Sequence, residues 1–293
     1  MKKHIIAISI KLLSLLPLNA VRAIGKLIGF IMLNFSKRSS ARLRHNLLIT
    51  GLATPETIAA MAKKSAQAFG MTLAESILIA WRKDPKYIQS LCDVDDESFA
   101  DIHKVLDNGE KVMFLTPHMG NFDLCFKCMI YRLPTDVTIL YKPNKDPILN
   151  QIMLDGRIEV NVHPEPTTAR GVRNLIRHFQ AGGDIGILPD NVAAAGSGEW
   201  VKFFGQDAYA ATLTAKIYQQ YQPTTVILRS IRTKNGFKMS LVPFKPSSND
   251  THAIMQELYQ VTESIILEAP EQYYWSYDRF RNVNNSKPKP QEG

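Results

Sequence analysis

The stretch KVMFLTPHMGNFD, residues 111–123, decides the fold. Its first six residues form a short, mostly apolar run, which is typical of a buried strand. A proline and a glycine follow, and Asn121 can cap a helix whose first turn contains Asp123. The stretch therefore predicts a strand that ends in a tight loop containing His118 and continues into a helix over 121–131.

Strands and helices alternate on both sides of this stretch. We expect the other strands and extended pieces at 137–141, 160–163, 184–189, 224–230 and 237–243. We expect the other helices from Thr54 to near Asp84, and over 96–108, 147–157, 167–181, 209–221 and 250–268.

This alternation defines the fold class. Strands that alternate with helices of about 10–15 residues form a largely parallel sheet covered on both faces. An Asn-Gly pair at 235–236 joins the last two strands as a hairpin, which makes the sheet mixed. We therefore predict an α/β fold with a mixed, largely parallel sheet flanked by helices, preceded by an N-terminal helical membrane anchor.

Length and composition limit the domain organisation. The chain has 293 residues, of which 45% are hydrophobic and 21% charged, as in a globular protein with an ample core. Three cysteines are too few for a disulfide framework, which fits a reducing, cytosol-facing location. No linker divides the body, so we expect a membrane-anchoring segment over 1–50, one α/β domain over 51–282 and a loose tail over 283–293.

The basic residues are concentrated at the front of the chain. Residues 1–55 contain nine Lys and Arg and no Asp or Glu, whereas the remainder has 26 basic and 27 acidic residues. A nearly neutral body argues against nucleic-acid binding. A basic, apolar N-terminus instead predicts attachment to a membrane surface rich in anionic lipids.

Two apolar runs, 5–18 and 23–35, lie within this basic segment. If one helix ran through both, four basic residues would fall on a single stripe: His4, Lys11, Arg22 and Lys26. Such a helix can lie in the bilayer interface with its basic side chains reaching lipid phosphates. A cleaved signal peptide and a buried helical hairpin are the alternatives, and we favour an uncleaved anchor.

His118 and Asp123 are the first candidates for catalysis. Active sites of open α/β sheets lie beyond the carboxyl ends of the strands, where both residues are expected. In one regular helix the two would point about 140° apart, so they can meet only if His118 precedes the helix. Asp123 could then fix the tautomer of the imidazole, and the helix N-terminus could stabilise an oxyanion.

Several short motifs occur in a fixed order along the chain. They are HMGNFD at 118–123, YKPNK at 141–145, GR at 156–157, LPD at 188–190, WVKFFG at 200–205 and QYYW at 272–275. Together they resemble, nearly end to end, the late (lauroyl/myristoyl) acyltransferases of bacterial lipid A biosynthesis, within the H-x4-D lysophospholipid acyltransferase superfamily. The resemblance implies an inner-membrane enzyme facing the cytoplasm. It would transfer an acyl group from acyl carrier protein to a hydroxyl of a Kdo-bearing lipid A precursor.

The resemblance also implies roles for particular residues. His118 would be the general base and Asp123 would stabilise its imidazolium, with no metal, cofactor or covalent enzyme intermediate. Because the acceptor carries phosphates and carboxylates, Lys142 and Arg157 are candidate clamps, unless they are solvated surface charges. Asn144 is a further candidate substrate-binding residue. Asp190 would position Arg157 or the acceptor, unless it only caps a turn.

Other functions remain as alternatives. The same chemistry could act on another membrane glycolipid or a lysophospholipid. A membrane-bound metallohydrolase would use His118, Asp123 and Asp190 as ligands, and a catalytically idle lipid-binding protein would use neither acid nor base. The absence of G-x-S-x-G, Walker A and G-x-G-x-x-G patterns excludes the common serine-hydrolase elbow and nucleotide sites.

Overall fold

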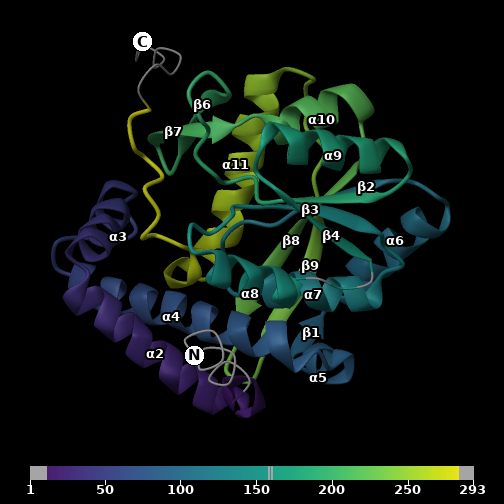
Figure 1. The fold of residues 1–293 in the computed structure, drawn as a ribbon. Coiled ribbons are helices and arrows are strands. Elements are labelled where there is room, and N and C mark those ends of the chain that lie inside the picture. Colours follow the sequence, from purple (N-terminus) through teal and green to yellow (C-terminus); the bar gives the residue numbers. More distant parts are fainter. Residues whose placement is uncertain (1–11, 158, 160, 284–293) are drawn as a thin grey trace, which may run out of the picture.

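A computed structural model describes residues 12–157, 159 and 161–283, and its centre is a seven-stranded sheet (Figure 1). The strand order is β1-β9-β8-β2-β5-β3-β4. β8 and β9 pair antiparallel, and the other neighbouring strands pair parallel. The strands are β1 (Cys92–Val94), β2 (Val112–Leu115), β3 (Val137–Tyr141), β4 (Val162–Pro166), β5 (Asp184–Ile187), β8 (Thr224–Arg232) and β9 (Phe237–Pro243). The predicted mixed, largely parallel sheet is confirmed.

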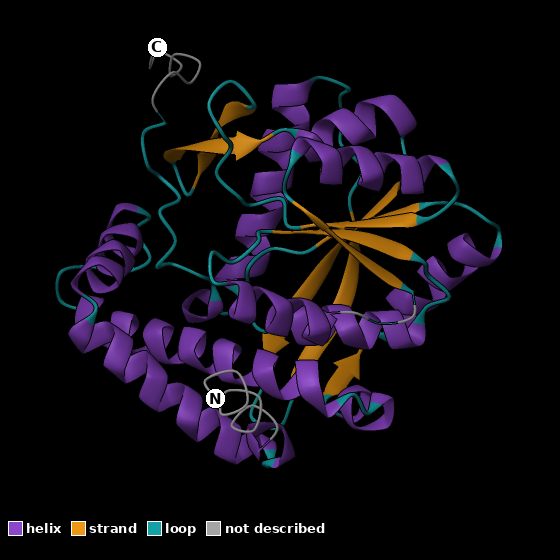
Figure 2. Cartoon of the chain, in the orientation of Figure 1, coloured by secondary structure: helices purple, strands orange, loops and turns teal. Residues whose placement is uncertain are grey.

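Helices cover both faces of this sheet (Figure 2). α9, α10 and α11 lie on one face, and α4, α7 and α8 lie on the other. The helices are α2 (Leu18–Phe35), α3 (Lys37–Ile49), α4 (Ile58–Arg82), α5 (Pro85–Ser90), α6 (Asp96–Asp107), α7 (Phe122–Arg132), α8 (Pro147–Arg157), α9 (Ala169–Gln180), α10 (Leu213–Tyr221) and α11 (Thr251–Leu267).

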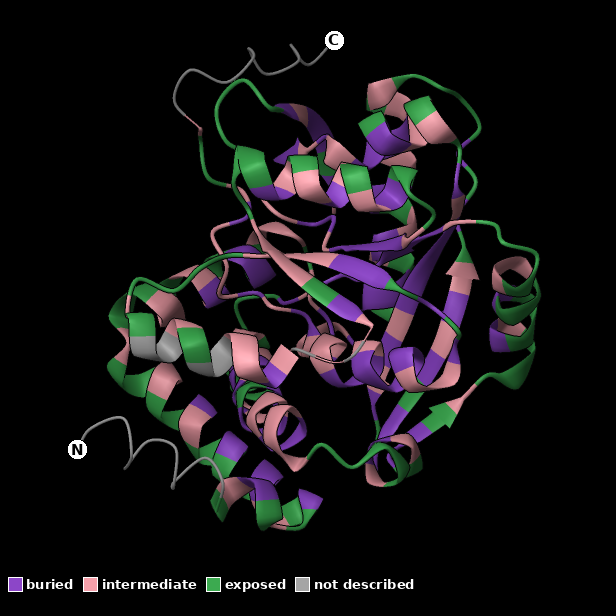
Figure 3. Cartoon of the chain, turned by 45° about the vertical axis from the view of Figure 1, so that its right-hand side comes forward, coloured by how far each residue is buried: buried purple, intermediate pink, exposed green. Residues whose placement is uncertain are grey.

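β2 shows how one strand serves both layers. Successive side chains of a strand point to opposite faces. Met113 and Leu115 accordingly join the core under α9, α10 and α11, whereas Val112 and Phe114 join the core under α7. All four are buried, which explains the continuous apolar run in the sequence, and Figure 3 shows the sheet interior as largely buried.

Most of the expected elements form, and several boundaries differ. β4 is Val162–Pro166 rather than 160–163, and β5 ends at Ile187 rather than at 189. α4 begins at Ile58 rather than after Thr54, because Thr54 and Thr57 form a hydrogen-bonded turn before it. The prediction of a helix over 209–221 was wrong for its first turn, because α10 begins at Leu213. There the chain forms β7 (Gln206–Ala211), which pairs antiparallel with β6 (Gly198–Phe203) in a separate two-stranded sheet.

α2 packs closely along α4. A Cβ atom added to Gly29 would lie 2.2 Å from the carbonyl oxygen of Ala66, and one added to Gly70 would lie 2.1 Å from that of Gly25. The two backbones are therefore in direct contact, as in helix pairs built on small residues. In the structure α2 is packed against the body rather than separate from it.

The expectation that Arg22 belongs to a lipid-facing basic stripe on this helix was wrong. It is 6% exposed, and its Nε donates to Glu75 Oε1 at 2.6 Å. Its Nη1 donates to the carbonyl oxygens of Thr233 and Lys234 at 2.7 and 2.8 Å, in the turn between β8 and β9. Arg22 thus faces the protein interior and not lipid phosphates, whereas Lys26 is exposed and His4 and Lys11 lie outside the described residues.

Replacement of Arg22 by alanine is expected to destabilise the protein by about 3–5 kcal/mol, because it removes one partner of a buried ion pair. It also leaves the carbonyl groups of the β8–β9 turn without their donor. Thermal or denaturant unfolding of the detergent-solubilised protein measures the loss. Lys26→Ala on the exposed face of α2 is the matched control, and an Arg22→Ala variant as stable as this control would contradict the prediction.

The opposite face of α2 is apolar and open. By length and composition α2 is one helix that could cross a membrane. Its exposed large apolar side chains are those of Ile24, Leu27, Phe30, Ile31 and Phe35. A helix that buries one face in the protein and exposes large apolar side chains on the other is suited to contact with lipid.

Candidate active site

The loop between β2 and α7 is shaped by Gly120. Its φ is +60°, a left-handed conformation that favours glycine. A Cβ atom there would lie 2.3 Å from the carbonyl oxygen of Ser230 on β8, so a side chain has no room. The Asn121 side chain accepts from the backbone N–H of Leu124 and caps α7, as the sequence predicts. The tight turn places His118 just before the helix.

His118 is held by Asp190 through two hydrogen bonds. Its ring Nδ1 lies 2.8 Å from Asp190 Oδ1, and its backbone N–H donates to Asp190 Oδ2 at 3.1 Å. Asp190 follows β5, the strand that pairs with β2, so the two residues meet at the carboxyl edge of adjacent parallel strands. With Nδ1 directed to the carboxylate, the other ring nitrogen, Nε2, is left to act as a base.

Asp190 is buried and stays ionised. Burial by itself would raise the pKa of its carboxyl group, but the charges of His118 and Arg279 and the hydrogen bonds from His118 lower that pKa below the usual range. Tyr273 donates its hydroxyl to Oδ2 at 2.8 Å, and Arg279 Nη2 donates to the same atom at 3.1 Å. A fixed anion of this kind orients an imidazole and stabilises its protonated form.

Asp123 lies in the first turn of α7, as expected, but the structure gives it a different partner. Its Oδ1 is 3.5 Å from Arg157 Nη2 at the end of α8. Among the hydrogen bonds of the described residues, none joins Asp123 to His118. Asp190 contacts the imidazole, and among the hydrogen bonds and ion pairs of the described residues none joins it to Arg157. The expectation that Asp190 positions the acceptor stays a prediction.

A cavity of about 650 Å³ opens beside these groups. His118, Asp123 and Arg157 lie in its wall. Most of the remaining wall is apolar and comes from α4 and α7: Phe69, Leu73, Ile77, Ile79, Trp81, Phe126 and Ile130. An apolar cavity with a few polar groups at one place binds an apolar chain and fixes its reactive end.

Aromatic rings hold His118 at the cavity. The imidazole packs against Phe122 and Tyr274, with ring centroids 5.1 and 6.2 Å away. Tyr274 in turn stacks on Phe69 of α4 at 4.3 Å, and its backbone N–H donates to the carbonyl oxygen of His118 at 3.0 Å. The imidazole is therefore restrained by ring contacts as well as by Asp190.

Two predicted substrate-binding residues lie away from this cavity. Lys142 and Asn144 are exposed in the segment between β3 and α8, and neither is among the described residues of the cavity wall. The Asn144 side chain accepts from the backbone N–H of Asp146, which shapes the loop. Both residues follow the carboxyl end of β3, on the same edge of the sheet as His118.

Sequence reasoning missed several functional candidates. Tyr273 and Arg279 complete the environment of Asp190, and the aromatic-basic run around them was the signal that could have found them. Lys127 lies in the cavity wall, forms an ion pair with Glu159 at 2.5 Å, and has a pKa lowered mainly by burial. Its place one turn after Asp123 on α7 was the only hint in the sequence.

A buried ion-pair network supports the loop from behind. Glu75, which is fully buried, lies between Arg22 and Arg232, whose Nη2 is 2.7 Å from Glu75 Oε2. The Asn121 side chain also donates to Glu75 at 3.2 Å. Thr72 donates to the Gly120 carbonyl oxygen at 2.6 Å. These contacts fix the loop that carries His118 relative to α2 and α4.

The fold and the site define a class. A histidine–carboxylate pair at the carboxyl edge of an α/β sheet, beside a cavity with a mostly apolar wall, suits an enzyme that acts on a lipid. Residues 2–282 match the family described as "Bacterial lipid A biosynthesis acyltransferase". The chain belongs to this family and is an acyltransferase of lipid A biosynthesis.

Similar proteins carry names that agree with this assignment. The chain is 22% identical over 274 residues to the lipid A biosynthesis palmitoleoyltransferase of Escherichia coli K12, covering 91% of this chain and 86% of the relative. It is also 22% identical to the lauroyltransferase of the same strain, covering 93% and 89%. A Haemophilus influenzae lipid A biosynthesis acyltransferase is 24% identical, with 93% and 88% covered.

Proposed function

We propose that this enzyme transfers a fatty acyl group from acyl carrier protein to a hydroxyl of a Kdo-bearing lipid A precursor. The observation that carries the proposal is the His118–Asp190 pair at the wall of the apolar cavity, in a chain of the lipid A acyltransferase family. The cavity suits the acyl chain of the donor or of the acceptor. The carboxyl edge of the sheet carries His118 as the base. It also carries Arg157 and Lys142, whose positive charges suit the phosphates of a sugar lipid.

The chemistry follows from the position of His118. A hydroxyl is a weak nucleophile, so Nε2 of His118 takes its proton as the oxygen attacks the thioester carbonyl. Asp190 stabilises the imidazolium that forms. The tetrahedral intermediate then collapses, the carbon–sulfur bond breaks, and the thiolate recovers the proton from His118. The products are an ester and a free thiol, and no cofactor takes part in the proposed reaction.

Asp123 and Arg157 are proposed to act together on the acceptor. Their ion pair is half-exposed in the cavity wall, where the guanidinium can also bind an acceptor phosphate. Lys142 and Asn144 are proposed to contact the polar headgroup farther out along the same edge. In this arrangement Asp123 keeps Arg157 in place, and its position at the N-terminus of α7 stabilises its charge.

The proposed location is the cytoplasmic face of the bacterial inner membrane. The exposed apolar face of α2 and three basic residues of α3, Lys37, Arg38 and Arg44, would contact an anionic leaflet together, each basic residue contributing about 1 kcal/mol. Arg42 instead pairs with Asp278. We propose residues 1–50 as the membrane-attachment segment and residues 51–282 as a single catalytic domain. Most of the proposed tail, residues 284–293, lies outside the described residues.

The test is transfer by the purified enzyme in detergent. Acyl carrier protein loaded with a fatty acid and a Kdo-bearing lipid A precursor are supplied, and mass spectrometry measures the product. We expect one added acyl group, with the rate unchanged by EDTA. Addition to a lysophospholipid but not to the lipid A precursor would contradict the acceptor, and transfer from acyl coenzyme A alone would contradict the donor.

The same assay examines the metallohydrolase alternative. That alternative needs His118, Asp123 and Asp190 around one ion, but Tyr273 and Arg279 already occupy Oδ2 of Asp190. A cation at that position would face the positive charge of Arg279. Activity that disappears with EDTA and returns with a divalent ion would therefore contradict the proposed mechanism.

A further inference from the structure

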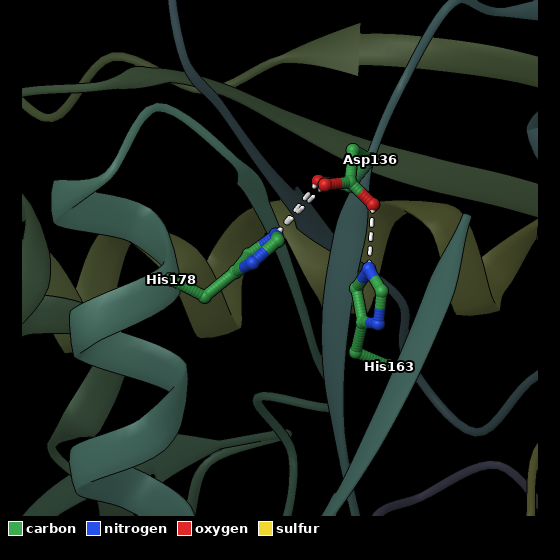
Figure 4. Close-up of side chains that lie close together, drawn as sticks. All are labelled: Asp136, His163 and His178. Atoms are coloured by element: carbon green, nitrogen blue, oxygen red, sulfur yellow. Dashed lines mark hydrogen bonds and ion pairs between the residues drawn. The ribbon is translucent and has the colours of Figure 1, made fainter.

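A second group of titratable side chains lies at the opposite edge of the sheet. Asp136 immediately precedes β3, His163 is the second residue of β4, and His178 lies near the end of α9 (Figure 4). Their ligand atoms all lie within 4.8 Å of one another. Because β3 and β4 run parallel, this cluster is at the amino edge, whereas His118 and Asp190 are at the carboxyl edge.

Both histidines direct a ring nitrogen at Asp136. His163 Nε2 is 2.6 Å from Oδ1, and His178 Nε2 is 3.8 Å from Oδ2 and 3.0 Å from the backbone oxygen of the same residue. The imidazole centroids are 5.0 Å apart. Figure 4 shows the carboxylate between the two rings.

The surrounding backbone fixes this arrangement. The carbonyl oxygen of Asp136 accepts from the N–H of Asp184 at 2.7 Å, and buried Asp184 also accepts from the Thr135 hydroxyl at 2.6 Å. Gly183 leaves the space that His178 fills, because a Cβ atom there would lie 1.9 Å from His178 Nε2. β3 and β4 pair within the sheet, and α9, which carries His178, packs against both strands.

From this geometry we propose that Asp136, His163 and His178 bind a divalent transition-metal ion, for which Zn²⁺ is the probe. Two imidazoles and one carboxylate are a donor set that suits Zn²⁺ and its first-row neighbours. Ligand atoms about 2.1 Å from a tetrahedral ion lie about 3.4 Å from one another. The two histidines approach different carboxylate oxygens, Oδ1 at 2.6 Å and Oδ2 at 3.8 Å, and one ligand atom from each of the three residues lies within 4.8 Å of the others. Binding therefore requires side-chain rotations that bring three ligand atoms to that spacing around one ion.

The site has room for water as the fourth ligand. The side chains of His163 and Asp136 are about half exposed, at 48% and 59%, and that of His178 is 22% exposed. A bound ion would join β4 and α9 to the segment before β3. Its position at the amino edge makes it independent of the acyl-transfer site.

The experiment is titration of Zn²⁺ into the full-length protein, purified in detergent without a polyhistidine tag and stripped with EDTA. Calorimetry is expected to show one ion per chain. Each of His163→Ala, His178→Ala and Asp136→Asn is expected to weaken binding by at least about tenfold, since even the loss of an outer-shell partner commonly does so. Zn²⁺ is also expected to raise the melting temperature of the wild type but not of the variants.

His103 provides the matched control. It is an exposed histidine paired with Asp107 at 2.9 Å on α6, so His103→Ala should leave Zn²⁺ binding unchanged. His163→Gln keeps side-chain bulk and shows whether a lost signal reflects misfolding, as does unfolding without metal. Acyl transfer should be unaffected in all these variants. Stoichiometric binding that persists in the His163→Ala/His178→Ala double variant, or a wild type without saturable binding, would overturn the proposal.

Discussion

His118→Ala is expected to lower acyl transfer by about 10²–10⁴, the usual contribution of a general base. The alanine variant keeps the loop, because Gly120, Asn121 and the Thr72 contact shape it independently of the imidazole. It leaves an acceptor hydroxyl with no group to take its proton. Single-turnover rates with saturating donor and acceptor measure the loss in the chemical step directly.

His45→Ala is the control for this variant, since His45 is an exposed histidine on α3. His45→Ala should unfold like the wild type, as is usual for an exposed site. His118→Ala also removes a hydrogen bond to buried Asp190, so we expect it to lose some stability but to remain folded. A purified His118→Ala enzyme with near-normal turnover would remove His118 from the proposed mechanism. It would leave the family assignment in place, because that rests on residues 2–282.

Asp190→Asn is expected to lower the rate of acyl transfer as severely as His118→Ala does. The analogous substitution in a serine protease lowers kcat by about 10⁴. An amide at this position can hold the imidazole in the wrong tautomer and cannot stabilise the imidazolium. Asp123→Asn is its matched counterpart. It should chiefly raise the KM for the acceptor, because it releases Arg157 without touching Nδ1 of His118.

The two asparagine variants separate two assignments of the carboxylate. The structure pairs His118 with Asp190, whereas the sequence motif H-x4-D suggests Asp123. A severe loss of kcat in Asp123→Asn, together with a mild effect in Asp190→Asn, would contradict the pairing in the structure. It would indicate that Asp123 is the partner of the His118 imidazole during turnover. Tyr273→Phe removes only one donor to Asp190 and is expected to have the smallest effect of the three.

The local structure around the site could be predicted because its causes are local. An apolar run, a glycine that must adopt a positive φ, and an asparagine cap all act within 111–123, and the structure confirms strand, turn and helix there. The partner of His118 could not be predicted in this way. Asp190 is 72 residues away, and its approach depends on the pairing of β2 with β5, which no short motif encodes.

The errors share a physical origin. The start of the helix expected over 209–221 instead forms β7, where Tyr209 packs on Trp200 with centroids 5.0 Å apart, so tertiary packing overrides local preference. Arg22 shows the same effect for charge. A basic residue within an apolar run looks the same in the sequence in two different environments. It can face lipid headgroups, or it can pair with a buried carboxylate, as Arg22 does with Glu75.

The contact of Arg22 with the β8–β9 turn has a practical consequence for anyone preparing the enzyme. Deletion of the apolar N-terminal segment is the usual route to a water-soluble preparation. Here the deletion would remove Arg22, which pairs with the buried carboxylate of Glu75. Substitution of the exposed apolar residues of α2 is the better strategy. Polar replacements at Leu27, Phe30 and Phe35 alter only the outer surface and keep Arg22 beside Glu75.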